Sequence, residues 1–137
     1  MAQFMHLLEG LRAAGESTRL RLLALLAEGE LTVGEIAEAL GQSQPRVSRH
    51  LRLLAEGGLI ERLPEGAWVF YRLAHDGDGG RLAHALLGLM PAGDPRLERD
   101  GRRLAENSAP WAREFARLSD WKWLSVASDP PRVTIRL

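Results

Sequence analysis

Apolar residues recur every three or four positions in the N-terminal part of the chain, which is the period of an amphipathic helix. The first run, with Met5, Leu8 and Leu11, predicts a helix over residues 5–14. The second run follows Ser17, its expected N-cap, and is apolar on two faces. We therefore expect this second helix to lie at the centre of the core.

Two shorter helices with capping signals are expected next. Thr32 and Glu35 have the spacing of a capping box, and Gly41 is expected to end this third helix. Ser43 is expected to cap a fourth helix that ends near Gly57. A short capped helix, a glycine turn and a second capped helix follow the order of a helix-turn-helix.

The next segment predicts a β-hairpin, because β-prone runs at residues 59–63 and 67–73 flank the turn residues 64–66, Pro-Glu-Gly. Its aromatic side chains are expected to include packing partners in the core or across the strands: Trp68, Phe70 and Tyr71. A fifth helix with a broad apolar surface is expected from Gly80 until Pro91.

The C-terminal part predicts a sixth helix over residues 94–105, a helical turn over 111–118 and a strand over 132–137. The fold class expected is mainly α with a β-hairpin wing (α+β), in the order α-α-α-α-β-β-α with extra C-terminal helices. We expect residues 1–90 to form one winged helix-turn-helix domain, followed by a C-terminal extension, 91–137.

The composition, 45% hydrophobic and 26% charged, is typical of a soluble globular protein. Because the chain has no cysteine, disulfides, thiolate metal sites and cysteine nucleophiles are excluded. There is neither a basic N-terminal region nor an apolar run long enough to cross a bilayer. These features predict a cytoplasmic protein that does not enter membranes.

The formal net charge is zero, which by itself argues against a nucleic-acid partner. The charges are nevertheless segregated along the chain. An acidic run on and before the third helix comprises Glu28, Glu30, Glu35 and Glu38. A basic run on the fourth helix comprises Arg46, Arg49 and Arg52. The uneven distribution therefore favours a nucleic-acid partner for the fourth helix.

The fourth helix has two distinct faces. At about 100° per residue, Val47, Leu51 and Leu54 form one apolar stripe, and Arg49 and Arg52 lie roughly opposite. Arginine pairs with guanine and glutamine with adenine in the major groove, and other polar side chains bind phosphate. The expected DNA contacts are Gln42, Ser43, Gln44, Arg46, Ser48, Arg49, His50, Arg52 and, from the hairpin, Arg62. The alternative is an ordinary solvated helix face.

Four segments resemble the ArsR family of bacterial repressors: residues 17–23 (STRLRLL), 42–51 (QSQPRVSRHL), 58–60 (GLI) and 69–73 (VFYRL). The resemblance covers about residues 7–89. It implies a homodimer built from the first and fifth helices, with two recognition helices in successive major grooves of an inverted repeat. It also implies a repressor that an inducer releases from DNA.

The chain departs from the metal-sensing members that it resembles. Those members carry cysteines in the third helix or an Asp-x-His element on the fifth, and both are absent here. The best remaining candidates for metal ligands are His75, Asp76 and His84. The case for a metal site is not strengthened by His6 or His50. Solvated or hydrogen-bonded histidines explain them better, so we expect no metal and no cofactor.

Residues 90–100 (MPAGDPRLERD) also resemble the linker of members in which this domain precedes an S-adenosylmethionine-dependent methyltransferase. No glycine-rich cofactor loop follows a strand here, so we expect the regulator without that enzyme. An inducer pocket formed by the aromatic residues of the tail is a less favoured hypothesis than their packing in the core: Trp111, Phe115, Trp121 and Trp123.

Two further functional classes compete with the repressor. An enzyme would need a convergent set of catalytic groups, and the best set, His75 with Asp76 and Asp78, is better explained as a solvated turn. A protein-interaction module could keep the winged fold without DNA binding. The basic fourth helix argues against that module.

Overall fold

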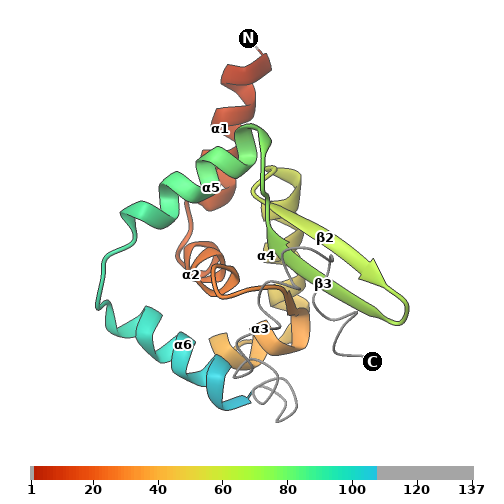
Figure 1. The fold of residues 1–137 in the computed structure, drawn as a ribbon, viewed down its shortest axis with the longest axis vertical. Coiled ribbons are helices and arrows are strands. Elements are labelled where there is room, and N and C mark those ends of the chain that lie inside the picture. The colour runs from red at the N-terminus through yellow and green to blue at the C-terminus, as the bar shows by residue number, and fades with distance from the viewer. Residues whose placement is uncertain (1, 108–137) are drawn as a thin grey trace, which may run out of the picture. The chain divides into compact units, whose positions relative to one another are not determined.

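The computed structural model describes residues 2–107 (Figure 1). A compact unit comprises Met1–Leu104, and the contacts given below lie within it. The elements are α1 (Ala2–Ala14), α2 (Ser17–Leu26), β1 (Leu31–Thr32), α3 (Val33–Leu40), α4 (Gln44–Glu56), β2 (Ile60–Glu65), β3 (Trp68–Leu73), α5 (Gly77–Leu89) and α6 (Pro95–Asn107). This order confirms the mainly helical fold with a β-hairpin. The helical turn expected at 111–118, the tail aromatics and the strand expected at 132–137 lie outside the described residues.

The caps of α3 and α4 are as expected, and the cap of α2 is not. Thr32 and Glu35 form the complete capping box of α3, and the Ser43 hydroxyl accepts from the backbone N–H of Arg46. Our assignment of Ser17 as the cap of α2 is wrong, because Glu16 holds that position and its Oε1 accepts from the Arg19 N–H at 2.9 Å. A carboxylate also complements the positive end of the helix dipole, which a hydroxyl does not.

The sheet is antiparallel, with three strands in the order β1-β3-β2. The hairpin of β2 and β3 confirms the expectation, and its register places Glu65 opposite Trp68. Pro64 is tolerated within β2 because β2 is an edge strand. The pattern did not predict β1, whose two residues, Leu31 and Thr32, are too few to show alternation.

Helix α2 is central to the core, as its two apolar faces predicted. Leu22 and Leu23 are fully buried, and they share one cluster with Ile36 of α3 and with Leu51 and Leu54 of α4. Each fully buried leucine stabilises the fold by about 1.5–3 kcal/mol. This cluster therefore fixes α4 relative to α2 and α3.

Helix α5 begins at Gly77, earlier than the expected Gly80. The glycines of its first turn allow the backbone to approach neighbouring segments. A Cβ atom on Gly79 would lie 1.8 Å from the carbonyl oxygen of Gly58, and one on Gly80 would lie 2.9 Å from that of Ala74. A glycine-rich stretch that resembles a loop is thus the first turn of a closely packed helix.

Candidate nucleic-acid interface

The buried face of α4 is the predicted one. Val47, Leu51 and Leu54 have no exposed side-chain surface. Pro45 lies in the first turn, where backbone N–H groups have no helical partner. The apolar stripe therefore holds the helix against the core and leaves the opposite face outward.

The opposite face of α4 is exposed and cationic. Its exposed polar residues are Gln44, Arg46, Ser48, Arg49 and Arg52, with one carboxylate, Glu56, in the last turn. Within residues 2–107, no side-chain hydrogen bond or ion pair engages the three guanidinium groups on this face. Three uncompensated positive charges on one helix face favour a polyanionic partner.

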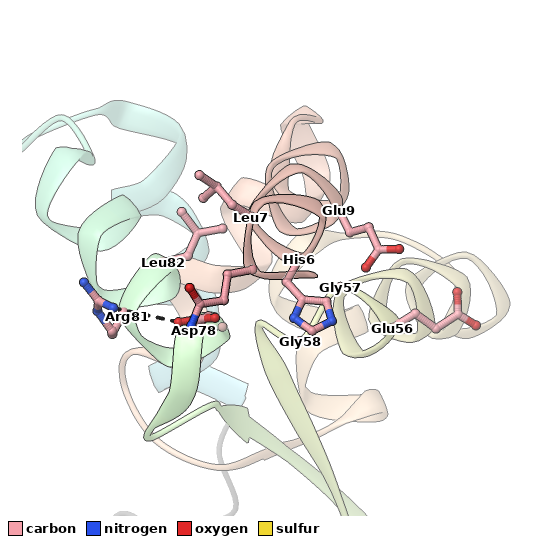
Figure 2. A pocket seen from close by; sticks show the side chains of 11 residues that line it. His6, Leu7, Glu9, Glu56, Gly57, Gly58, Asp78, Arg81 and Leu82 are labelled. Atoms are coloured by element: carbon pink, nitrogen blue, oxygen red, sulfur yellow. Dashed lines mark ion pairs between the residues drawn. The ribbon is translucent and has the colours of Figure 1, made fainter. Parts of the chain in front are cut away.

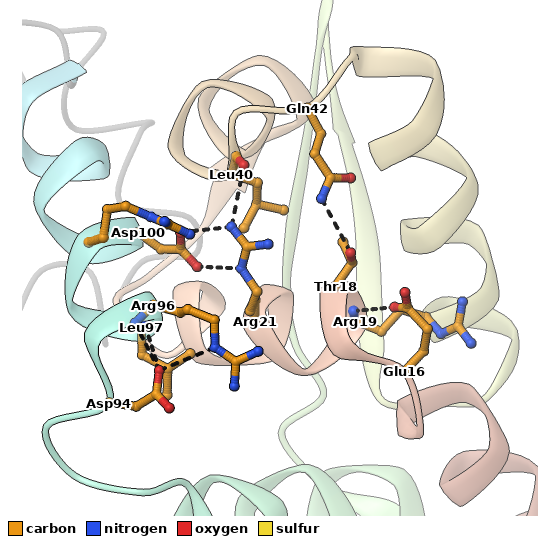
Figure 3. A network of polar contacts seen from close by, with 11 residues as sticks. Glu16, Thr18, Arg19, Arg21, Leu40, Gln42, Asp94, Arg96, Leu97 and Asp100 are labelled. Atoms are coloured by element: carbon orange, nitrogen blue, oxygen red, sulfur yellow. Dashed lines mark hydrogen bonds and ion pairs between the residues drawn. The ribbon is translucent and has the colours of Figure 1, made fainter.

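Gln42 is placed differently from its neighbours on α4. It is half-buried in the turn between α3 and α4, and its Nε2 donates to the Thr18 hydroxyl at 3.2 Å (Figure 3). Thr18 itself is 7% exposed. Gln42 therefore ties the helix-turn-helix turn to α2, and its contact with DNA stays a prediction.

His50 is a packed, hydrogen-bonded side chain at the edge of the same surface. Its Nδ1 lies 3.1 Å from Arg19 Nη1 and 3.9 Å from Glu16 Oε1. Burial lowers the pKa of His50; Glu16 opposes that shift, whereas Arg19, Arg46 and Arg49 add to it. The neutral imidazole accepts the Arg19 hydrogen bond. Beside it is an open hollow of about 350 Å³ lined by Glu16, Arg46, Arg49 and His50.

The two arginines of the hairpin differ in their surroundings. Arg62 of β2 is exposed, whereas Arg72 of β3 lies 2.8 Å from Glu61 Oε1 and 3.7 Å from Glu30 Oε2. Arg72 is therefore held within the sheet by two carboxylates. Arg62 is the hairpin arginine that is accessible to a partner.

The hairpin aromatics divide between the core and solvent. Phe70 is buried and Tyr71 packs against the core, as expected. Trp68 is not part of the core, because it is 60% exposed. Trp68 begins β3 opposite Glu65, at the end of the hairpin farthest from the helices.

Helices α1 and α5 pack together and carry apolar residues on their outer surface. The large exposed apolar side chains there are Phe4, Met5, Leu7, Leu11 and Leu89. Next to them is an open hollow of about 710 Å³ where α1, the end of α4 and the start of α5 meet (Figure 2). Leu7 and Leu82 lie on one side of it and His6 lies over Gly57 and Gly58. Exposed apolar surface of this extent is typical of a protein interface.

The candidate metal and catalytic residues do not converge. His75 and Asp76 are exposed, Asp78 lies 3.8 Å from Arg81 and His84 Nδ1 lies 2.8 Å from the Gly80 carbonyl. Among the described residues, no group of three or more His, Asp or Glu side chains could hold a metal ion.

No helix in residues 2–107 is long and apolar enough to span a bilayer.

An ion pair that the sequence did not reveal attaches α6 to α2. Arg21 Nε and Nη2 donate to the two Asp100 carboxylate oxygens at 2.8 and 2.9 Å (Figure 3). Nη2 also donates to the Leu40 carbonyl at the end of α3, at 3.3 Å. Arg21 and Asp100 are 79 positions apart, so no local pattern indicates the pair.

Known proteins are similar to this chain in sequence and in fold. The model of the family "Bacterial regulatory protein, arsR family" matches residues 16–62. The arsenic resistance transcriptional regulator ArsR1 of Pseudomonas putida is 41% identical over 96 residues, which cover 69% of this chain and 74% of that protein.

Two solved structures have the same fold. One is the homodimeric winged helix-turn-helix DNA-binding domain of a possible ArsR-family regulator from Mycobacterium bovis. It is 34% identical with a TM-score of 0.57, over 64% of this chain and 81% of that one. The other is the transcriptional repressor BigR from Xylella fastidiosa. It is 31% identical with a TM-score of 0.53, over 66% of this chain and 92% of that one. With the capped α3–α4 pair and the hairpin, these matches show that the chain belongs to the ArsR family of bacterial regulatory proteins.

Proposed function

We propose that this protein is a sequence-specific DNA-binding transcriptional repressor that acts as a homodimer. The observation that carries the proposal is α4, whose Val47, Leu51 and Leu54 are buried while its opposite face presents arginines that form no ion pair within the described residues. A helix of this kind fits the major groove, where arginine reads guanine and glutamine reads adenine.

Each group of residues at this surface has its own role in the proposal. Gln44, Arg46, Ser48, Arg49 and Arg52 contact bases and nearby phosphates from α4. Arg62 contacts a DNA phosphate from the hairpin. The start and the side of α4 are held by Gln42, Ser43 and His50, which also approach the DNA backbone. In this proposal the residues of the exposed α4 face read the base sequence, and the other contacts position the protein on the DNA.

The dimer in this proposal forms through α1 and α5. The relative from Mycobacterium bovis is described as homodimeric, and the exposed apolar residues of α1 and α5 supply a surface that a second copy would bury. Two α4 helices related by a twofold axis match an inverted-repeat operator in double-stranded DNA. The inducer of the proposed repressor is a small molecule that no cysteine binds, because the chain has none.

The deciding experiment is an anisotropy titration of the full chain with the DNA upstream of its own gene, at several salt concentrations. Specific binding that weakens steeply with salt supports the proposal, because phosphate contacts release counterions. A random duplex of equal length is the control. Absence of binding, or equal affinity for both duplexes at every salt concentration, overturns it and leaves a winged module for protein contacts.

A further inference from the structure

Helix α6 is anchored close to the helix-turn-helix by the Arg21–Asp100 pair. Asp100 is 1% exposed and both of its oxygens accept from Arg21. Arg21 also reaches the Leu40 carbonyl, the last residue of α3. A bidentate pair fixes orientation as well as distance, so α6 has a defined position beside the end of α3.

The anchor places cations of α6 against the turn that leads into α4. A Cβ atom on Gly41 would lie 3.1 Å from Arg103 Nη1. Gly41 ends α3 and Ser43 caps α4 only two residues later. The guanidinium of Arg103 therefore lies next to the N-terminal end of the proposed reading helix.

Arg102 and Arg103 have no acidic partner in the described part of the chain. Arg102 is exposed and Arg103 is half-buried, and neither takes part in any ion pair of residues 2–107. Their neighbours on α6 differ, since Arg96 lies 3.6 Å from Asp94 and Arg99 lies 3.9 Å from Asp100. Within residues 2–107, the α6 arginines that form no ion pair are thus the two near the turn, on a helix that also carries Glu98 and Glu106.

Helix α6 and the hairpin are on different sides of the helix-turn-helix. In Figure 1, α6 lies beside α2 and α3 on the side away from β2 and β3. A DNA duplex that meets α4 and the hairpin has backbone on both flanks of the reading helix. A duplex bound with one flank at Arg62 would therefore turn its other flank toward the C-terminal half of α6.

We propose that Arg102 and Arg103 of α6 bind DNA backbone phosphates that flank the site read by α4, and thereby extend the contact surface beyond the helix-turn-helix and hairpin. The inference rests on the proposed DNA-binding function. Arginine suits this role because its planar guanidinium pairs with phosphate oxygens and stays charged at any working pH. These contacts strengthen binding without adding sequence preference.

The test compares the salt dependence of binding for the full chain and its variants on the same operator duplex. The slope of log K against log salt is negative, and each lost phosphate contact reduces its magnitude by about 0.9. For a dimer, Arg103→Ala is expected to lower it by about 1.8, and the double variant Arg102→Ala/Arg103→Ala by up to about 3.6. Arg103→Lys keeps the charge and should keep most of the slope.

The matched control is Arg96→Ala, an arginine on the same helix that already faces Asp94 and is expected to leave the slope unchanged. Thermal melts of all variants exclude loss of folding. A wild-type slope in the double variant overturns this inference while the proposed function stands. If the unmodified chain binds no DNA, both fall together.

A second arm uses duplex length. Trimming the base pairs that flank the operator should weaken DNA binding by the wild type. It should leave binding by the double variant unaffected, because the double variant lacks the side chains that reach the flanks. Equal weakening of both proteins would show that the flanking contacts come from elsewhere, and would contradict the assignment to α6.

Discussion

Arg19 connects His50 of α4 with the end of α1. Its Nη1 lies 3.1 Å from His50 Nδ1, while its Nε donates to the carbonyl oxygen of Ala13. Helix α1 carries part of the proposed dimer surface and α4 carries the proposed reading face. A single arginine thus links the two surfaces whose relative position decides whether two α4 helices fit successive grooves.

This link makes stability depend on pH. The pKa of His50 is lowered in the folded protein, first by burial and then by Arg19, Arg46 and Arg49, so the unfolded chain binds the proton more readily. The stabilising effect of neutral His50 is present above the ordinary value of 6.5 and is lost as the pH falls through the lower folded pKa. Urea unfolding of the wild type and His50→Gln between pH 7.5 and pH 5 measures it. We expect the free energy of unfolding to fall less steeply with decreasing pH in the variant. Parallel plots of this free energy against pH for the two proteins would contradict this role.

Arg49 and Arg62 should differ in the kind of affinity that they supply. Arg49→Ala is expected to weaken specific binding by about 1–3 kcal/mol and to relax preference at particular base pairs. Arg62→Ala is expected to weaken specific and random duplexes alike, because a hairpin phosphate contact carries no sequence information. Titrations against single-substitution operators measure both. An equal loss on specific and random DNA for Arg49→Ala would refute its base-reading role.

The buried stripe of α4 predicts a large effect on stability. Leu51 is fully buried, so Leu51→Ala should destabilise the fold by about 2–5 kcal/mol through lost burial and a residual cavity. Ser48→Ala on the exposed face should change the free energy of unfolding by no more than about 0.5 kcal/mol. Denaturant unfolding followed by circular dichroism compares the two. Similar midpoints for both variants would show that the faces have been assigned wrongly.

Removing one member of the buried Arg21–Asp100 pair should be costly. Asp100→Ala leaves Arg21, which is 14% exposed, without its carboxylate, and a loss of about 3 kcal/mol is expected. Replacing both members, as Arg21→Met/Asp100→Leu, should recover much of that loss, because the double variant no longer has the Arg21 charge in a largely buried site; Arg99, which also faces Asp100, is 44% exposed and keeps access to solvent. Unfolding free energies of the single and double variants provide the test. A double variant no more stable than the single one would contradict it.

The proposed dimer surface can be tested on α1. Leu7→Glu places a charge on the exposed apolar surface of α1, and we expect it to convert the dimer into a monomer and to reduce operator affinity. Trp68→Ala removes a more exposed apolar side chain from the hairpin and should leave the protein dimeric. Sedimentation velocity at matched concentrations distinguishes them. A Leu7→Glu protein that remains dimeric would place the interface elsewhere.

The sequence by itself determined the features that depend on local spacing. The stripe of Val47, Leu51 and Leu54, the capping box of Thr32 and the hairpin all follow from periodicity and cap chemistry within a few residues. The exposure of Arg46 and Arg49 follows from the same helical period. For these features, the local preference and the tertiary packing agree.

Only the tertiary structure decided which polar side chains are engaged with distant partners. Gln42 turns toward Thr18, Arg72 lies 3.7 Å from Glu30, and Arg21 pairs with Asp100. Each of these contacts joins segments that come together only when α2, the sheet and α6 assemble around the core. No pattern of neighbouring residues encodes such a contact, because its free energy depends on a distance and a degree of burial that exist only in the folded chain.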